Sequence, residues 1–269
     1  METHQLMFEL SHPIRYEIMK CLEEQPLRLT KIGEQVNANN PEVSRHLDRL
    51  KNADLVGKGS DGRYFLTDIG VILLILLPSF SFVAHHPEFI KKNDLTRIPP
   101  CFISRLGELV NGEQEVGLLN AVHHSLKIIR ESKERLFIIT NETNADYQKE
   151  IFERIQNGVQ IRSIIDTSFR FPTPRISIPE EITKRILRVY DQIPVVMIGN
   201  EKEAGVSFPI GEGKFNFFPR YSTDPEFIQW CHDLFEYIWI RGDSIFDHPE
   251  LIHGPDGLDN QKDITLNLK

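Results

Sequence analysis

Two short helical patterns separated by three residues, within positions 29–52, most constrain the fold of this chain. The first pattern covers residues 29–36, with Thr30 as its expected cap. Asn37-Ala38-Asn39 then favours a turn, because asparagine adopts turn conformations readily. A second helix is expected from Asn40-Pro41 to about residue 51. Its apolar residues recur at helical spacing and should face inward: Val43, Leu47 and Leu50.

Two further helices are expected before this pair. Residues 2–10 form one helical pattern, and Pro13 suits the first turn of a second helix that ends before Pro26. Ile14, Ile18, Cys21 and Leu22 give the second helix an apolar face. Arg15, Glu17 and Glu24 are expected in solvent.

The second helix of the pair presents hydrogen-bonding side chains at its start, which is the chemistry that reading the DNA major groove needs. The residues expected to face solvent or the groove are Asn39, Asn40, Glu42, Ser44, Arg45, His46 and Arg49.

A hairpin is expected directly after these helices. Asp61-Gly62 is a turn signal between two short strand-like runs in residues 57–66. Lys58 and Arg63 would flank its tip, where they could contact backbone phosphates.

The order of these motifs resembles the ArsR-type winged helix over residues 5–70. The resemblance is carried by residues 10–15, by Asn40-Pro41-Glu42-Val43-Ser44-Arg45-His46-Leu47, by Leu55-Val56 and by the hairpin. It implies a transcription regulator that binds double-stranded DNA. Residues 29–36 contain no Cys-x-Cys, so thiolate metal sensing is not expected. Cys21, Cys101 and Cys231 are too widely spaced for a zinc ribbon.

The charge of the chain limits how it could meet DNA. Its 31 basic and 39 acidic residues give a net charge of −8, so any DNA contact must come from a local patch. Residues 40–66 hold five basic and four acidic residues, a net charge of +1. The alternative is a protein-interaction or ligand-binding module whose winged helix does not contact DNA.

An apolar stretch follows at residues 69–84. Pro78 interrupts it, and it is shorter than the roughly 20 apolar residues of a membrane-spanning helix, so no membrane partner is expected. Residues 69–77 are instead predicted to join two copies of the chain into a homodimer. Residues 93–100 are interpreted as a linker, and residues 1–11 lack the pattern of a signal peptide, which indicates a cytoplasmic protein.

The second half alternates helical and strand patterns and predicts a βαβ unit in a mostly parallel sheet. Helices are expected at 118–129, 144–156 and 224–240. Strands are expected at 136–140, 159–165, 187–190, 194–198, 205–208 and 215–218. The fold class is therefore α+β and α/β, with a DNA-binding domain at 1–68, a linking and dimerisation helix at 69–93, an α/β domain at 94–241 and a flexible tail at 242–269.

This half resembles the C-terminal domain of archaeal methanogenesis-type regulators. The resemblance is carried by residues 98–107, 193–199 and 227–237. It implies a phospholipase-D-like sheet that senses or assembles. The catalytic His-x-Lys of phospholipase D is absent, as are a phosphate-binding loop and a Gly-x-Ser-x-Gly elbow, so no enzyme is expected.

Candidate ligand residues lie near the ends of the expected strands, where open α/β sheets form clefts: Asp166, Arg188 and Tyr190. They would bind a small-molecule effector of unknown identity. The pairs His85-His86 and His123-His124 are interpreted as structural, because adjacent residues on a helix point about 100° apart and cannot both face one metal. No metal or cofactor is expected.

Overall fold

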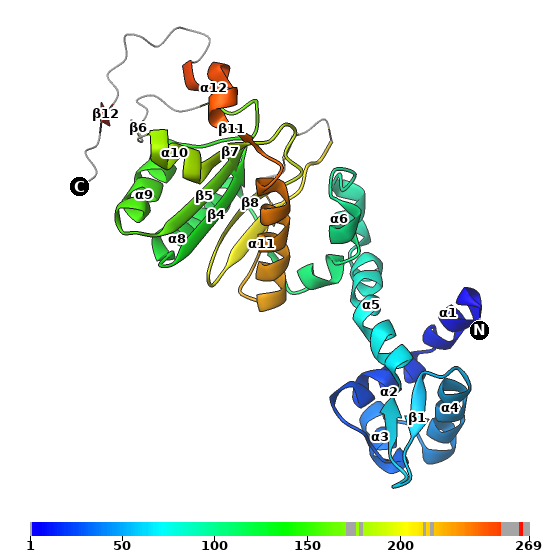
Figure 1. Cartoon of the computed structure of the whole chain (residues 1–269). Coiled ribbons are helices and arrows are strands. Elements are labelled where there is room, and N and C mark those ends of the chain that lie inside the picture. Colours follow the sequence, from blue (N-terminus) through cyan, green and yellow to red (C-terminus); the bar gives the residue numbers. More distant parts are fainter. Residues whose placement is uncertain are drawn as a thin grey trace. The chain divides into compact units, whose positions relative to one another are not determined.

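The computed structural model describes residues 2–170, 180–211, 214, 215 and 218–253, and the strand backbones of 176–177 and 264–265. The chain divides into two compact units, Met1–Ser81 and Phe82–Lys269. The boundary falls inside α5 (Asp68–His85), within the segment expected to link two domains (Figure 1).

The first unit is a helix-turn-helix followed by a hairpin. Its helices are α1 (Thr3–Leu10), α2 (Pro13–Glu24), α3 (Leu29–Val36) and α4 (Asn40–Asn52), and its strands are β1 (Val56–Lys58) and β2 (Tyr64–Leu66). Asn37 ends α3 in the left-handed conformation, with a φ of 52°. Asn39 caps α4 by accepting a hydrogen bond from the backbone of Glu42. The expected order of elements is therefore confirmed.

Two local expectations in this unit are wrong. Thr30 is not a cap, because α3 begins at Leu29 and has Arg28 at its N-cap. Arg15 is only 3% exposed, although we expected it in solvent. Its guanidinium donates to the carbonyl oxygens of Phe8 and Glu9 at 2.7 and 2.6 Å, so it satisfies the C-terminal end of α1.

The hairpin has the expected turn. Val56 pairs with Leu66 and Lys58 with Tyr64 in an antiparallel register, and Gly62 has a φ of 80° in the turn. A further bridge joins Tyr64 to Leu27, which ties the hairpin to the connection between α2 and α3. The core of the unit includes Ile18, Ile32, Val43, Leu47, Leu50 and Leu55, all fully buried.

The linking helix expected at 69–93 is divided into α5, which continues through Pro78 to His85, and the short helix α6 (Pro87–Lys92). Leu74 is buried in the core of the first unit, whereas Ile72, Ile75 and Leu76 are exposed. Among the described residues, α5 is the one helix that is long and apolar enough to cross a membrane by length and composition.

An eight-stranded mixed sheet forms the centre of the second unit, in the order β11-β7-β5-β4-β8-β9-β10-β3. The strands are β3 (Glu113–Gln114), β4 (Arg135–Thr140), β5 (Gln160–Ile165), β7 (Leu187–Val189), β8 (Val196–Asn200), β9 (Ala204–Ser207), β10 (Arg220–Ser222) and β11 (Asp243–Ser244).

The expectation of a mostly parallel sheet is wrong. The pairs β4–β5 and β5–β7 are parallel, and the five other neighbouring pairs are antiparallel. A tight turn between β8 and β9 forces the chain to return beside itself. In that turn Asn200 accepts backbone hydrogen bonds from Lys202 and Glu203. The expected helical crossover joins β4 to β5 through α9 (Ala145–Gln156), and α10 (Glu180–Ile186) lies between the parallel strands β5 and β7 along the chain.

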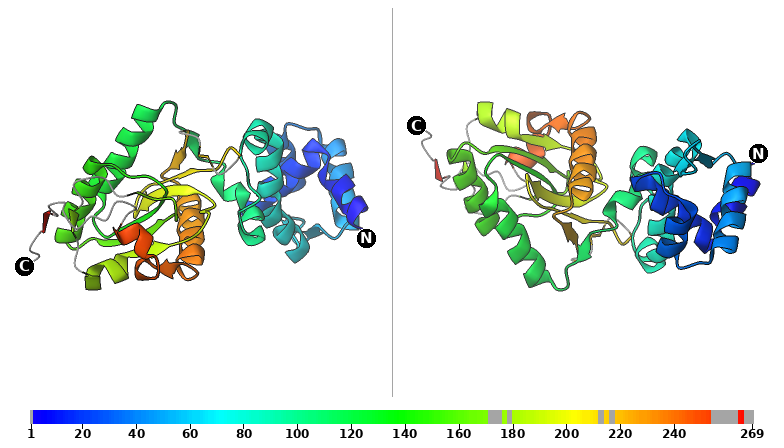
Figure 2. Two further views of the ribbon diagram at one scale, coloured as in Figure 1. Left: turned by 90° about the horizontal axis from the view of Figure 1, so that it is seen from above. Right: turned by 90° about the horizontal axis from the view of Figure 1, so that it is seen from below.

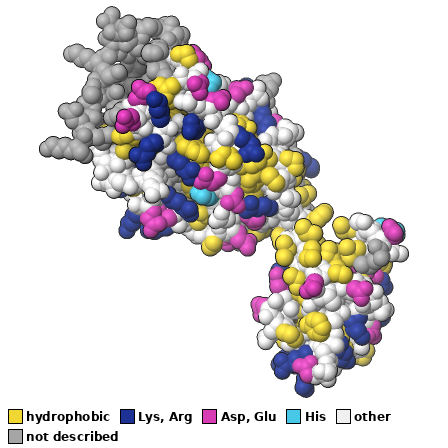
Figure 3. Space-filling model, in the orientation of Figure 1, with side chains coloured by type: hydrophobic (Ala, Val, Ile, Leu, Met, Phe, Trp, Pro, Cys, Tyr) yellow, Lys and Arg dark blue, Asp and Glu magenta, His cyan; other side chains and the backbone are white. Residues whose placement is uncertain are grey.

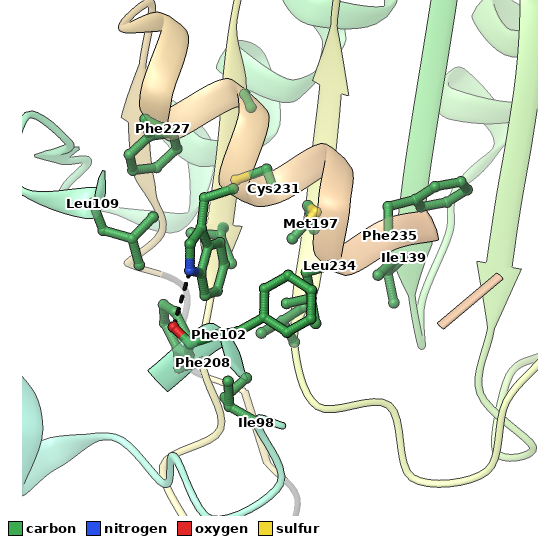
Figure 4. Packing of buried hydrophobic residues seen from close by; sticks show 14 of the residues in the cluster. Ile98, Phe102, Leu109, Ile139, Met197, Phe208, Phe227, Cys231, Leu234 and Phe235 are labelled. Carbon is green, nitrogen blue, oxygen red and sulfur yellow. Dashed lines mark hydrogen bonds between the residues drawn. The ribbon is translucent and has the colours of Figure 1, made fainter. Parts of the chain in front are cut away.

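Helices cover both faces of this sheet (Figure 2). The longest, α11 (Pro225–Trp239), packs on one face, while α8 (Leu118–Glu131) and α9 (Ala145–Gln156) pack on the other. Side chains of α11 including Phe227, Cys231, Leu234 and Phe235 point toward the strands, and the indole Nε1 of Trp230 donates to Phe102 O at 3.2 Å (Figure 4). Because successive residues of a strand point to opposite faces, Phe137 and Ile139 of β4 enter the core beneath α11, whereas Leu136 and Ile138 enter the core beneath α8 and α9.

Short elements surround the sheet: α6 (Pro87–Lys92), α7 (Pro100–Ile103), η1 (Leu106–Leu109), α10 (Glu180–Ile186), η2 (Ile245–Asp247), α12 (Pro249–His253), and the pair β6 (Ile176–Ser177) and β12 (Ile264–Thr265). The boundary at residue 242 that we expected for a flexible tail is too early. Strand β11 joins the sheet, and Ile245 and Leu251 are buried. The remainder of that tail lies outside the described residues, apart from the β12 backbone.

Two other expectations need correction. The segment 93–100 is no free linker, because Ile98 is buried in the core of the second unit. The strand expected at 215–218 includes residues 216 and 217, which lie outside the described part of the chain. The strand that the structure describes nearby is β10, at Arg220–Ser222.

Candidate nucleic-acid interface and ligand cavity

Helix α4 has one face fixed in the core and one face directed outward. Val43, Leu47 and Leu50 are fully buried, which confirms the expected inward face. On the other side Asn40 and Arg45 are exposed and Ser44 is half-buried. A rigid core contact therefore fixes the direction in which these three polar side chains point.

Asn39 and Glu42 hold the start of this helix. The Asn39 side-chain oxygen accepts from the Glu42 backbone nitrogen at 3.0 Å, which satisfies one unpaired donor of the first turn. The Asn39 amide also lies 3.5 Å from the Glu42 carboxylate. The Asn39 side chain is thus used in capping, and the Glu42 carboxylate accepts from its amide.

His46 does not face outward as we expected. It is 4% exposed, and its ring centroid lies 4.3 Å from that of His12. Neither ring nitrogen has a hydrogen-bond partner among the described residues. Burial, and then the charges of His12 and Arg15, hold the pKa of His46 below its usual value. His46 is therefore a core residue and does not belong to the outward face of α4.

Arg49 is exposed but already has a partner. Its Nε lies 3.0 Å from Oε2 of Glu9, and the same carboxylate lies 3.1 Å from Arg15 Nε. Hydrogen bonding to Arg49 is the main reason that the pKa of Glu9 lies below its ordinary value. No local pattern in the sequence predicts this contact, because Glu9 and Arg49 are far apart along the chain.

The hairpin places two basic side chains in solvent. Lys58 is exposed, with its ammonium 5.0 Å from the centre of the Tyr64 ring. Arg63 lies 3.4 Å from Asp61, and both side chains are more than half exposed, so this ion pair is weak. In the space-filling view, basic and acidic side chains lie together at the end of the first unit that carries the hairpin (Figure 3).

The three candidate ligand residues of the second unit have structural contacts. Asp166 is buried, and its two carboxylate oxygens accept from the backbone nitrogens of Ser168 and Ile193. The Arg188 guanidinium lies over the Trp239 ring at 5.5 Å. Tyr190 packs against the core next to α11. The structure does not bring these side chains into a described cavity.

A cavity of about 830 Å³ lies elsewhere, between α8, the start of α9 and strands β4, β8, β9 and β10. Its volume is in the range of small-molecule sites. Periodicity in the sequence could not reveal it, because β4 and α8 lie far along the chain from β8, β9 and β10.

The histidine pairs have different surroundings. His124 stacks on Tyr221 with centroids 3.8 Å apart, and its ring nitrogens lie 3.2 and 2.6 Å from carboxylate oxygens of Glu115 and Glu203. His123 is exposed. Within the described residues, no group of three His, Cys, Asp or Glu side chains is arranged to hold a metal ion.

Comparison with known proteins identifies the first unit. Residues 12–58 match the family model described as bacterial regulatory protein, arsR family. This match covers α2, α3, α4 and β1. The chain therefore contains an arsR-type helix-turn-helix domain. The helices and the hairpin of the first unit agree with this class of domain. The comparison with curated proteins returned no match.

Solved structures resemble the chain only distantly. The archaeal chromatin protein TrmBL2 is 11% identical, with 90% of this chain and 98% of that chain covered and a TM-score of 0.40. Nuc from Salmonella typhimurium, a phospholipase D family member, is 15% identical, with 49% and 96% covered and a TM-score of 0.35. An IclR homolog from Microbacterium sp. strain HM58-2 is 11% identical, with 83% and 94% covered and a TM-score of 0.25. All three scores are too low to assign a function.

Proposed function

We propose that the protein is a sequence-specific DNA-binding transcription regulator. The observation that carries this proposal is the outward face of α4, where Asn40, Ser44 and Arg45 project from a helix fixed by three buried aliphatic residues. This face belongs to the segment that matches the arsR-family model. In the proposed complex, α4 enters the major groove and Arg45 reads a base edge.

The hairpin would supply contacts that do not depend on sequence. Lys58 and Arg63 are exposed, and a phosphate can displace Asp61 from its weak pairing with Arg63. The chain has a net charge of −8, so we expect binding to depend steeply on these few cations and on salt.

We further propose that the regulator is a homodimer joined through α5. Ile72, Ile75 and Leu76 are each more than half exposed in a single chain, and an apolar face of this kind is typical of an interface. Two copies would also present two α4 helices to two half-sites, as dimeric helix-turn-helix proteins do.

For the second unit we propose binding of an effector without chemical change. The sequence lacks the His-x-Lys of phospholipase D, which would be needed for catalysis on a related sheet. Its resemblance to archaeal methanogenesis-type regulators supports a role in the control of that or related metabolism. A regulator of this kind acts in the cytoplasm.

Selection from a pool of random duplex DNA tests the proposal. The full-length protein should enrich a common motif over successive rounds, because side chains on α4 discriminate base edges. Arg45→Ala should lose preference at one base position of that motif. Enrichment of no motif, together with binding that competitor DNA abolishes, would favour a protein-interaction module.

A further inference from the structure

The floor of the cavity in the second unit is a row of residues from four strands. In the sheet register, Ile138 pairs with Ile198, Ile198 with Gly205, and Gly205 with Tyr221. Directly opposed residues of antiparallel strands point to the same face. These four residues therefore share the face that α8 and α9 cover.

Small residues on β9 make this floor hollow. Gly205 and Ser207 occupy the positions opposite Ile198 and Val196. A Cβ atom at Gly205 would lie 2.1 Å from the Tyr221 ring, so only glycine fits beneath that ring. The Tyr221 side chain bends over Gly205 toward α8, where its hydroxyl donates to Ala121 O at 3.2 Å. The Tyr221 ring thus covers Gly205, and the cavity lies beside this ring on the same face of the sheet.

The walls of the cavity are mainly aliphatic and aromatic. Helix α8 contributes Leu118 and Val122, and α9 contributes Tyr147 and Ile151. Leu118, Ile210 and Phe218 line the cavity and are still about half exposed. Large apolar side chains in such positions favour a ligand that covers them.

The hydroxyl groups near the floor are bonded within the protein. Ser125 Oγ lies 2.9 Å from Tyr221 Oη, and Tyr147 Oη donates to Val122 O at 3.4 Å. Burial raises the pKa of both tyrosines, so the phenols stay neutral. The charged residues that line the described cavity, Glu142 and Lys214, are exposed. A charge held deep in the cavity would have no ionic partner there and would be costly to bury.

We propose that this cavity binds an uncharged, largely apolar small molecule. The role of this molecule as an effector rests on the proposed function, whereas its binding to the cavity does not. Such a ligand would lie on Ile138, Ile198 and Tyr221 and would cover the apolar rim. A neutral polar group on the ligand would be directed outward, toward the segment 141–144, where the Glu142 carboxylate would repel an anion.

Fluorescence titration of the full-length protein with the neutral dye Nile red tests the proposal. Every protein in this titration carries Ile75→Glu as a background substitution, because the exposed apolar face of α5 could also bind the dye. We expect one saturable site. Dodecanol should displace the dye at least ten times more effectively than dodecanoate, which carries a charge on the same chain.

Variants locate the site. Val122→Trp and Ile151→Trp fill the cavity from two different helices, α8 and α9, and should each weaken dye binding at least tenfold. Val110→Trp, at an exposed position that does not line the cavity, should leave it unchanged. A thermal melt identifies any variant that fails to fold. If one of the two filling variants is unfolded, dye binding by the other one tests the site. Unchanged dye binding in a folded filling variant, or equal displacement by dodecanoate, would overturn the proposal.

These results are separable from the test of DNA binding. Selection of duplex DNA reports on α4, and dye binding reports on the second unit. If the cavity stays empty while a motif is enriched, the regulator proposal stands and the ligand class is wrong. If the dye binds and no motif is enriched, the cavity proposal stands without a regulatory role.

Discussion

At the scale of single residues, His46 shows how far spacing alone predicts burial. Helical spacing correctly predicts that Val43, Leu47 and Leu50 face inward. The polarity of His46 predicts an outward position, and the structure contradicts it. Its position, three residues after Val43 and four before Leu50, lies on the same helical face as these aliphatic residues. At this position helical spacing therefore predicts burial correctly, and residue type does not.

Replacement of His46 tests its burial and its pKa. Because the folded pKa is lowered from 6.5, the unfolded chain binds more protons just below that pH. Stability is thus complete above about pH 6.5 and falls as the pH drops toward the folded pKa. His46→Leu should flatten this loss and leave DNA affinity within about twofold, as expected for a residue that makes no DNA contact.

Melting curves of both proteins between pH 5 and pH 8 provide the measurement. His123→Leu, at an exposed position on α8, serves as the control and should keep the wild-type slope. A large loss of DNA affinity in folded His46→Leu would return His46 to the interface.

Arg15 belongs to the residues whose role only tertiary structure reveals. Its hydrogen bonds to Phe8 O and Glu9 O join α1 to α2, and Glu9 joins both to Arg49. Arg15→Met should keep the volume but remove these bonds, at a cost of about 2 kcal/mol for a charge-assisted pair. Hydrogen exchange should then accelerate in α1.

Lys20→Met provides a matched control on the same helix, since Lys20 is half exposed and pairs only with Glu23 in the contacts described. It should leave exchange in α1 unchanged. Equal protection of α1 in wild-type and Arg15→Met protein would show that Arg15 does not hold that helix.

At the scale of elements, the long helices were predicted well, whereas three of the short strands of the large sheet were not. Helices α2, α4, α8 and α11 have long apolar faces or capping residues that define them in the sequence. Strands β3, β10 and β11 contain two or three residues each, which is too short for an alternating pattern. Their pairing with distant strands creates them. The error about parallel strands has another source, because the predicted strands β8 and β9 are joined by a tight turn and β8 pairs antiparallel with β4.

Helix α5 shows a similar limit. Pro78 led us to end the predicted interface at Leu77, but the helix continues to His85. Leu74 packs into the first unit and is unsuitable for testing a dimer, since its replacement by a charge would damage that core. Ile75, which is 70% exposed, is the better position.

Ile75→Glu should convert the proposed dimer to a monomer, because it places a charge in an apolar interface. Analytical ultracentrifugation of the full-length protein measures the mass. Leu119→Glu alters a leucine of comparable exposure on α8 and should leave the dimer intact. An unchanged dimeric mass in Ile75→Glu would place the interface elsewhere.

At the scale of the whole molecule, the sequence predicted two parts and the kind of domain in the first. It predicted the ligand residues of the second part from the ends of strands, and the structure gives those residues structural contacts instead. The cavity depends on Ile138, Ile198, Gly205 and Tyr221 meeting in one row. That meeting is set by strand order and register, which no single segment encodes.

The central claim is that α4 reads DNA, and the affinity of Arg45→Ala for the selected duplex tests it most directly. Titrations across a salt series should show a loss of about 1–3 kcal/mol for Arg45→Ala and relaxed preference at one base. Lys58→Ala and Arg63→Ala should weaken all sequences alike and reduce the salt slope by about one. Lys149→Ala, which removes an exposed charge from the second unit, should match wild type. Wild-type affinity and base preference in folded Arg45→Ala would contradict the claim.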